Sequence, residues 1–388
     1  MEKYTVIIPT RDRCETLGPA LRTCLEQTYG NLQVIVSDNC STDATAEVVA
    51  QHQASNLRYL RTGERLSMAD NFEFALSHVD DGFLMFIGDD DGLLPDAVSY
   101  VAQLQKSSGL LAISGSNAEY CWPNFPDATR ANSLKWRSSH PCSEIRSSRQ
   151  WVRRCLSYGD AYTFEMPKLY HGFVHKRVID RAYSGGRFFH SMTPDAYSAF
   201  AIAFFVDEFI YSHRPFTIGG ASKRSNGVSS MDAKGTGGEA QKFLMENTIK
   251  QHPALEWCPS LEVCMTEAFM QFAERFPDLT AGYTPDWDLM LRFALDNANS
   301  RTLPRIEVAV HAMARMHAVD LKTKCFRYQL ARGRRLFGRS KRVFRSYFDG
   351  QRVMDASLHG VKDVQDAAHL IQRAIAAAEG AAFPKRGF

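Results

Sequence analysis

The chain has 388 residues, of which 45% are hydrophobic and 23% charged, and its formal net charge is +3. This is an ordinary globular composition, and the near balance of charges argues against nucleic acid as a partner. The nine cysteines are scattered without a C-x-x-C pair, so neither a disulfide framework nor a zinc site is indicated. The chain starts on a strand-like pattern, and no apolar stretch reaches the ~20 residues that span a bilayer. We therefore expect a cytoplasmic protein without a transmembrane segment.

The first 115 residues alternate between strand and helix patterns. Apolar runs predict strands at Tyr4–Pro9, Leu32–Val36, Leu57–Leu60, Phe83–Ile87 and Leu110–Ser114. Between them, apolar residues at helical spacing predict helices near 17–25, 46–49, 69–79 and 95–105. Such alternation is typical of an α/β fold with a mostly parallel sheet and helices on both faces.

The pattern weakens after this region. Residues 115–165 are expected to be irregular, with one helix near 149–156. Tyr170–His175 predicts a strand, 178–183 a short helix, and Thr193-Pro194 starts an apolar helix through about Phe205. Phe209–Ser212 and Pro215–Ile218 predict two strand pieces, followed by a loop rich in Gly and Ser at 219–238.

From about Glu239 helical patterns prevail, at 261–276, 287–298, 306–319 and 364–378. We therefore expect one domain at 1–238, in halves of 1–115 and 116–238, and a helical C-terminal region at 239–388.

The apolar run Phe83–Ile87 leads through Gly88 directly into Asp89, Asp90 and Asp91. Three adjacent carboxylates repel one another and cannot be buried without partners. Open α/β sheets bind ligands at the carboxyl ends of their strands, and hard oxygen ligands suit Mg²⁺ or Mn²⁺ carrying substrate phosphates. The alternative is a solvated acidic turn that complements the dipole of the next helix.

Two other predicted strands also end in polar residues. The first is followed by Thr10, Arg11, Asp12 and Arg13, and the second by Ser37, Asp38, Asn39, Ser41 and Asp43. Ser41 and Asp43 fit the capping of the next helix, whereas Asp38 and Asn39 precede the cap and are better candidates for ligand contacts. Together with the three carboxylates, these groups suit a nucleotide diphosphate and a metal. No Walker A sequence is present, and the G-x-G-x-x-A match at Gly235–Ala240 follows no strand.

Three segments together resemble the signatures of family-2 inverting glycosyltransferases of the GT-A fold. They are T-V-I-I-P-T-R-D-R, V-I-V-S-D-N-C-S-T-D-A-T and I-G-D-D-D-G-L-L-P. A fainter resemblance continues through Asp195 and the I-G-G-x-S segment at Ile218–Ser222, as in bacterial transferases that build lipopolysaccharide O-antigen and other surface polysaccharides. The resemblance implies a nucleotide-sugar donor, a Mn²⁺ or Mg²⁺ ion, and a single displacement at the anomeric carbon. The implied acceptor is a saccharide or a polyprenyl-linked saccharide.

The resemblance also implies roles for individual residues. Asn39 lies where many members carry an Asp that accepts the N3 hydrogen of the base. Gly88 replaces the first Asp of the usual D-x-D-D, so we expect the metal at Asp90, with Asp91 as a second candidate. Asp195 matches the general base, although helix-dipole complementation would also explain it. The expected donor-binding residues are Pro9, Thr10, Arg11, Arg13, Asp38, Asn39, Asp89, Asp91, Lys223 and Arg224.

Several alternatives stay open. The amide of Asn39 both donates and accepts, so UDP, dTDP and CDP sugars are all allowed. A nucleotidyltransferase or a non-catalytic nucleotide-sugar-binding protein on the same sheet is the competing class of function. A pyrophosphorylase is disfavoured because the loop after the first strand has its only Gly at position 18, and a processive synthase because no Q-x-x-R-W occurs. His171 and His175 are spaced i,i+4, but the β-like stretch between them argues against a metal pair.

The segment Lys322–Arg345 contains ten Lys or Arg residues, no acidic residue, and interleaved aromatic and aliphatic residues. Such a segment can dock on an anionic membrane surface. A solvated basic helix and a nucleic-acid patch are the alternatives.

Overall fold

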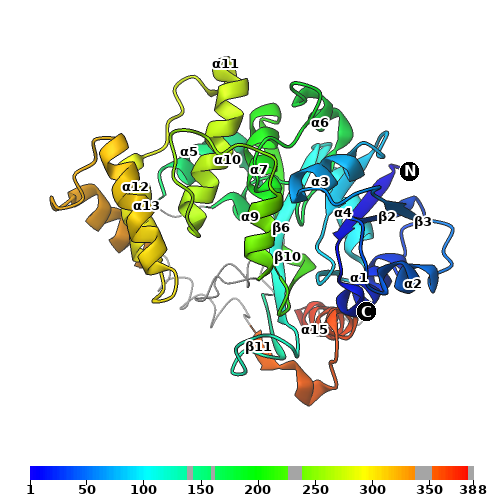
Figure 1. Ribbon diagram of the computed structural model, residues 1–388. Helices are drawn as coiled ribbons and strands as arrows, with labels where there is room; N and C mark the ends of the chain where they lie inside the picture. Colours follow the sequence, from blue (N-terminus) through cyan, green and yellow to red (C-terminus); the bar gives the residue numbers. More distant parts are fainter. Residues whose placement is uncertain (138–142, 159–161, 226–237, 337–351, 383–388) are drawn as a thin grey trace.

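The computed structural model describes residues 1–137, 143–158, 162–225, 238–336 and 352–382. These residues form an 11-stranded mixed sheet with the strand order β11-β7-β6-β9-β4-β1-β2-β3, to which β10 adds by pairing with β5, β6 and β8 (Figure 1).

The N-terminal half of the sheet is parallel, as predicted. Its strands are β1 (Tyr4–Thr10), β2 (Leu32–Asp38), β3 (Leu57–Arg61) and β4 (Phe83–Phe86). The helices between and after them are α1 (Cys14–Leu25), α2 (Thr45–Ala50), α3 (Met68–Leu76) and α4 (Ala97–Ser108). Separate buried clusters lie on the two faces of the sheet, which explains why β1, β2 and β4 are almost continuously apolar. The predicted α/β fold class is confirmed.

The expectation that residues 115–165 are irregular was wrong. Three strands lie in this part of the chain, and a fourth and a fifth follow: β6 (Ala112–Cys121), β7 (Ser133–Trp136), β8 (Ser143–Ser147), β9 (Phe173–His175) and β10 (Glu208–Ala221). The sequence S-G-S-N at 114–117 within β6 has weak intrinsic preference for a strand, but pairing along β10 supplies the hydrogen bonds that stabilise it. The two strand pieces predicted near 209–218 are one strand with a register shift between Ser212 and Thr217.

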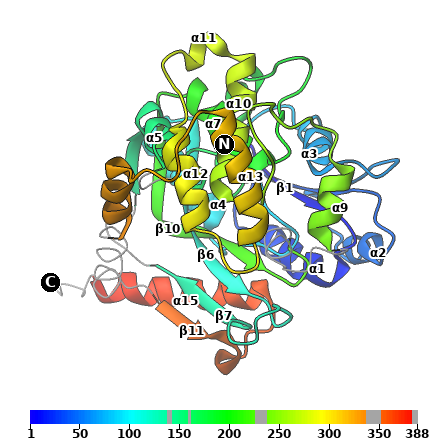
Figure 2. The ribbon, with the colours of Figure 1, turned by 60° about the vertical axis from the view of Figure 1, so that its left-hand side comes forward.

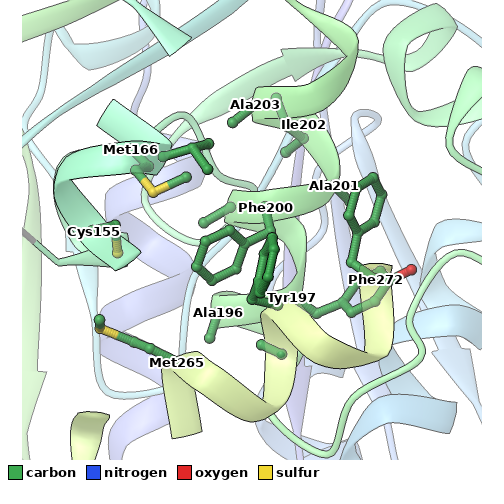
Figure 3. Close-up of a cluster of buried hydrophobic side chains, with 14 of the residues drawn as sticks. Cys155, Met166, Ala196, Tyr197, Phe200, Ala201, Ile202, Ala203, Met265 and Phe272 are labelled. Carbon is green, nitrogen blue, oxygen red and sulfur yellow. The ribbon is translucent and has the colours of Figure 1, made fainter. Parts of the chain in front are cut away.

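A buried helix, α7 (Pro194–Phe205), forms the centre of the second half of the molecule. Its side chains pack between α5 (Ser148–Leu156) and α10 (Leu261–Arg275), and Figure 3 shows Tyr197 and Phe200 of α7 near Phe272 of α10. Because α7 is covered on nearly all sides, its sequence has no polar stripe. The remaining elements here are η1 (Thr163–Glu165), α6 (Lys176–Arg181), α9 (Glu239–Glu246), α11 (Pro277–Thr280), α12 (Trp287–Asp296) and α13 (Leu303–Met316).

The C-terminal part of the chain returns to the sheet (Figure 2). Strand β11 (Arg352–Asp355) pairs with β7, η2 (Ala356–His359) follows, and α15 (Val364–Ala382) packs against α1. Arg22 of α1 donates to Gln365 at 2.5 Å and lies 3.3 Å from Asp363. The described residues after 238 are mainly helical as predicted, with β11 as an unforeseen strand, and the predicted division at 238 stays a prediction. Among the described residues, no helix is long and apolar enough to cross a membrane.

Candidate active site

Asp91, at the end of the acidic turn after β4, holds the turn to two other segments. Its Oδ2 accepts hydrogen bonds from Gly88 N and the Tyr170 hydroxyl, both at 2.6 Å, and lies 3.1 Å from His171 Nε2. Its Oδ1 accepts from Gly220 N at 2.7 Å. Burial favours the neutral acid, but the charge of His171 and these hydrogen bonds outweigh it and hold the pKa of Asp91 below its ordinary value. Both oxygens are therefore engaged, which favours Asp89 and Asp90 as the carboxylates that face a ligand.

The contacts of Asp91 also explain Gly88, where the resembling family usually has an aspartate. A Cβ atom at this position would lie 2.9 Å from Asp91 Oδ2 and 2.9 Å from the Tyr170 hydroxyl. Any side chain would push apart the groups that hold the turn together. The departure from D-x-D-D is thus coupled to the buried contact between Asp91 and Tyr170.

Asp89 and Asp90 carry the excess negative charge of the site. Thr10 Oγ1 donates to Asp89 Oδ2 at 2.7 Å, and Ser222 Oγ donates to Asp90 Oδ2 at 2.7 Å. The Arg13 guanidinium lies 3.6 Å from Asp89 and 4.0 Å from Asp90. Burial and the neighbouring charges of Asp91 and Asp89 raise the pKa of Asp90 to about 7. Burial likewise raises the pKa of Asp89, against the opposing effects of Arg13 and Thr10.

This pair of carboxylates fits a divalent cation. Asp89, Asp90 and Asp91 are only 7%, 6% and 2% exposed, and such buried carboxylates are stabilised by added positive charge. Mg²⁺ is commonly held by one or two carboxylates together with substrate phosphates, and Mn²⁺ accepts the same hard oxygen ligands. Within the part of the chain that the structure describes, no group of three or more His, Cys, Asp or Glu side chains is arranged around a metal position.

The end of β10 closes over the acidic turn without room for a side chain at Gly220. A Cβ atom there would lie 1.7 Å from the carbonyl oxygen of Asp90, which also accepts a hydrogen bond from Trp122 Nε1 at 2.9 Å. The short strand β5 (Gly92–Leu93) pairs with β10 beside this contact. The carboxylates are thus held between the ends of β1, β4 and β10.

Replacing Gly220 with alanine is expected to destabilise the fold by about 1–3 kcal/mol, because the methyl group must displace the Asp90 backbone. We also expect weaker nucleotide binding, since the same displacement moves the carboxylates. Gly219→Ala is the matched control, because its Cβ atom would meet nothing closer than the Ala118 carbonyl at 3.8 Å. Denaturant unfolding and nucleotide titration of both variants test this. Equal stabilities of the two variants would contradict the close contact.

The predicted basic residues lie around the same turn with unequal roles. Arg13 also donates to the carbonyl oxygen of Arg224, and Arg11 forms an ion pair with Glu246 at the end of α9. The backbone N–H of Lys223 donates to Asn124 Oδ1 at 3.3 Å, and Pro9 lies within β1 opposite Ser37 of β2. Ser222 and Ser225 were not among the expected site residues, but their hydroxyls both donate to Asp90. The I-G-G-x-S segment contained the available signal for Ser222.

Asp38 and Asn39 contact protein groups rather than open space. The buried carboxylate of Asp38 accepts hydrogen bonds from the Tyr59 hydroxyl, from Arg61 at 3.1 Å, and from Ser41 N at 2.8 Å. The Asn39 amide donates to the Leu66 carbonyl and accepts from the Leu66 N–H, both at 2.8 Å. Recognition of a base by Asn39 would require this reciprocal pair of hydrogen bonds to open.

Asp195 lies in the first turn of α7 and is exposed to solvent. Protein packed around it nevertheless lowers its solvation and raises the pKa of its carboxyl, while the N–H of Ala196 and the charge of Lys168 oppose this effect. Tyr170 is partly buried, and burial, together with the charges of Asp91, Asp90 and Asp195, raises the pKa of its hydroxyl well above the ordinary value. Tyr170 therefore connects the acidic turn with the surroundings of Asp195.

The segment 168–171 is the main part of the site that sequence reasoning missed. Burial lowers the pKa of Lys168 to about 8 and the charge of Asp195 opposes this effect, whereas Tyr170 and His171 contact Asp91. His171 has a left-handed backbone with φ of 59°, and His175 instead accepts a hydrogen bond from Arg177 N at the start of α6. No periodic pattern marks this segment, because its partners lie about 80 and 27 residues away.

Comparison with known proteins gives one family match and two partial relatives. Residues 5–164 match Glycosyl transferase family 2. The chain is 33% identical over 106 residues to the GalNAc(5)-diNAcBac-PP-undecaprenol beta-1,3-glucosyltransferase of Campylobacter jejuni, covering 26% of this chain and 34% of that protein. It is 30% identical over 99 residues to the uncharacterized protein MT1568 of Mycobacterium tuberculosis, covering 26% of this chain and 31% of that protein. The chain thus spans about a third of the length of these curated relatives.

Two solved structures are among those similar to this chain. Residues 1–349 of S. aureus TarS, in complex with UDP-GlcNAc, match with a TM-score of 0.48 and 12% identity over 87% of this chain and 92% of that one. The mannosyltransferase PcManGT of Pyrobaculum calidifontis, in complex with GDP-Man and Mn²⁺, matches with a TM-score of 0.43 and 17% identity over 83% of this chain and 88% of that one.

Proposed function

Since residues 5–164 of this chain belong to glycosyl transferase family 2, we propose that the protein moves a sugar from a nucleotide diphosphate to an acceptor hydroxyl. The observation that carries this proposal is the buried pair Asp89 and Asp90, held between the ends of β1, β4 and β10. Tyr170 donates a hydrogen bond to Asp91 of the same turn, and the charge of the accessible carboxylate of Asp195 also acts on its hydroxyl. The pair Asp89 and Asp90 suits binding of a charged donor, and Asp195 suits removal of a proton.

The carboxylate pair and Asp195 would have distinct tasks in an inverting single displacement. Asp89 and Asp90 would hold a Mn²⁺ or Mg²⁺ ion, which would supply positive charge against the departing diphosphate. Arg13 lies beside both carboxylates and would contact the same phosphates. Asp195 would take the proton from the acceptor hydroxyl, for which an ionised carboxylate open to solvent is suited.

The acceptor we propose is a saccharide or a lipid-linked saccharide in the building of a cell-surface polysaccharide. The Campylobacter jejuni relative is named for an undecaprenol-linked glycan, and its similarity to this chain supports that class of acceptor. The reaction would then take place in the cytoplasm or at the inner face of the cytoplasmic membrane. A nucleotidyltransferase or a nucleotide-sugar-binding protein without activity is the alternative.

Incubation of the purified protein with labelled nucleotide sugars and Mn²⁺ tests the function. A transferase or its slow hydrolytic side reaction releases nucleoside diphosphate, whereas a nucleotidyltransferase turns over pyrophosphate. A protein that only binds shows thermal stabilisation without product. Release of pyrophosphate, or binding without turnover for every donor and acceptor class, would contradict the proposal.

The donor base is expected to be a pyrimidine. Asn39 has both a donor and an acceptor, so UDP, dTDP and CDP are all compatible with it once its contact with Leu66 opens. Competition of free UDP, dTDP and CDP with a bound labelled nucleotide would rank them. Tighter binding of GDP or ADP than of all three pyrimidine nucleotides would show that the base prediction is wrong.

Docking on an anionic membrane is the proposed role of the basic segment, of which residues 337–345 lie outside the described part of the chain. Residues 326–336 are helical, and Phe326 is 76% exposed, with Leu330 and Leu336 also exposed. Arg327 and Arg332 pair with Asp286 and Asp296, which reduces the charge available to a membrane. Arg335 is buried 3.8 Å from Glu262 and stacks on Phe293, so it belongs to the fold.

The exposed cations Lys322, Lys324 and Arg334 are therefore the residues to change. Their combined replacement by Glu is expected to abolish co-sedimentation with vesicles of anionic lipid, since each cation near such a surface contributes about 1 kcal/mol. Binding of the wild-type protein to anionic vesicles should weaken as the salt concentration rises. The same charge change at the exposed Lys106, Arg177 and Lys362 is the control. Equal wild-type binding to neutral and anionic vesicles would contradict electrostatic docking.

A further inference from the structure

Glu267 is a buried carboxylate of α10 that has no role in the reaction as described so far. The residue is 4% exposed, and both of its oxygens accept hydrogen bonds. Oε2 accepts from the Ser191 hydroxyl, and Oε1 accepts from Gln271 Nε2 at 2.8 Å. Burial raises the pKa of this carboxyl, while these two hydrogen bonds and the backbone N–H of His252 oppose the rise. Glu267 thus acts as a double acceptor, and its effect depends on the groups that it holds.

The Ser191 hydroxyl carries the contact from Glu267 to the residues before α7. Ser191 is fully buried, and a hydroxyl group has one hydrogen and two lone pairs. Its hydrogen goes to Glu267, so in the 3.1 Å contact between Ser191 Oγ and Thr193 Oγ1 the threonine must be the donor. The backbone N–H of Thr193 donates to the same serine oxygen at 3.2 Å. Glu267 therefore fixes the Ser191 hydroxyl, which in turn holds Thr193 by both its side chain and its backbone.

Thr193 is the N-cap residue of α7, and Asp195 follows in the first turn. A threonine at this position commonly accepts a hydrogen bond from a backbone N–H of that turn. Among the residues that the structure describes, the Thr193 side chain accepts no such bond, and its hydroxyl donates to Ser191 instead. The Thr193 carbonyl accepts from Tyr197 N at 3.0 Å, which closes the turn. The start of α7 is therefore held from α10, through Ser191, rather than by a cap of its own.

Gln271, the other partner of Glu267, has an amide group that can lie in one orientation only. Its Nε2 donates to the Lys250 carbonyl at 2.8 Å as well as to Glu267, while its Oε1 accepts from Arg275 at 3.1 Å. Because a carbonyl only accepts and a guanidinium only donates, this amide cannot be flipped. Position 267 therefore has to offer one acceptor to Gln271 and a second acceptor to Ser191. The two oxygens of a carboxylate meet both needs, whereas an amide has only one oxygen.

We propose that Glu267 is a positioning residue for the proton transfer, which holds the first turn of α7 through Ser191 and so keeps Asp195 in place. This proposal rests on the proposed function, in which Asp195 removes the proton of the acceptor hydroxyl. A general base must lie within hydrogen-bond reach of that proton, and a displacement of about 1 Å can cost on the order of 10²-fold in rate. Because Asp195 is exposed to solvent, its position depends on how firmly its backbone is held.

The test removes this link from both of its sides. Glu267→Gln leaves one acceptor for two donors, and Ser191→Ala removes the hydroxyl that holds Thr193. In each variant we expect kcat to fall about 10- to 100-fold, because the base is displaced. The affinity for the donor should stay at the wild-type value, since Asp89 and Asp90 are unchanged. The double variant should be about as slow as the slower single variant, because both changes break the same link.

Glu262→Gln is the matched control, because it also leaves one acceptor for two donors at a buried position of α10. Glu262 is 1% exposed and accepts hydrogen bonds from Ser260 at 2.9 Å and from Asn297 at 2.6 Å. Neither partner belongs to α7 or to the residues before it. The control should therefore lose stability while kcat stays at the wild-type value. An equal fall of kcat in the control would overturn the specific role of Glu267.

Hydrogen exchange, followed by mass spectrometry of peptides that cover residues 191–198, provides a readout without activity. Loss of the link should make the first turn of α7 open more often, so its amides should exchange faster in Glu267→Gln and Ser191→Ala than in Glu262→Gln. Unchanged exchange, or an unchanged kcat in both variants, overturns the proposal. If Glu267→Gln does not fold, Ser191→Ala alone provides both readouts. If the wild type turns over no donor, the proposed function fails, and the exchange measurement still decides whether Glu267 holds the start of α7.

Discussion

Asp195→Asn is expected to lower turnover by about 10²–10⁴-fold while nucleotide-sugar affinity changes little. Asparagine keeps the shape of the side chain in the first turn of α7 but cannot accept a proton. Asp195 belongs to α7, whereas Asp89 and Asp90, which are assigned to the donor, follow β4, so binding should survive. Single-turnover kinetics and donor titration would separate the two effects.

Stability provides an independent check on the role of Asp195. Its pKa is raised in the folded protein, so at pH 7 its ionised form is less favourable in the folded than in the unfolded state. The neutral Asp195→Asn variant should therefore melt at the same temperature as the wild type or higher. Asp207→Asn, at an exposed position just beyond α7, is the matched control and should leave turnover unchanged. Loss of donor binding with retained turnover would assign Asp195 another role.

The sequence was sufficient to predict buried strands, because their apolar runs are visible over a few neighbouring residues. Apolar runs located β1 to β4, and the three carboxylates follow the end of β4, as the sequence predicted. The start of α7, with Thr193 and Pro194, was clear from its capping pattern. These features depend on neighbours within a few residues, which one sequence displays directly.

The sequence was insufficient where long-range partners decide the structure. Asp91 and Asp90 are chemically alike in the sequence, and only Gly220, Tyr170 and His171 make Asp91 the one that holds the turn. Asn39 likewise has the chemistry of a base-binding residue, yet its amide pairs with the Leu66 backbone. The polar strand β6 is stabilised through β10, about 100 residues away in the chain.

The difference between Asp90 and Asp91 leads to opposite expectations for two substitutions of the same type. Asp90→Asn removes a charge that is unfavourable in the folded state, because burial and two neighbouring carboxylates raise its pKa to about 7. An ionised group with a raised folded-state pKa costs stability above its unfolded pKa, so this variant should be more stable than wild type near pH 8. Asp91 has a lowered pKa, and its stabilising effect is present above its unfolded pKa and lost as the pH falls. Asp91→Asn should therefore be less stable than wild type near neutral pH.

The two substitutions should affect activity in the opposite order to stability, with Asp90→Asn as the more harmful one. Asp90→Asn retains an oxygen that can accept the Ser222 hydrogen bond, but it lacks the charge that would hold a divalent cation. We expect turnover with Mn²⁺ to fall about 10²–10³-fold, because the positive charge that opposes the developing charge of the diphosphate is lost. Thermal stabilisation by Mn²⁺ plus nucleotide should disappear in Asp90→Asn and persist in the folded fraction of Asp91→Asn. Asp90→Asn protein with wild-type turnover and wild-type sensitivity to chelators would refute the assignment of the metal to Asp90, and with it the division of roles between the two carboxylates.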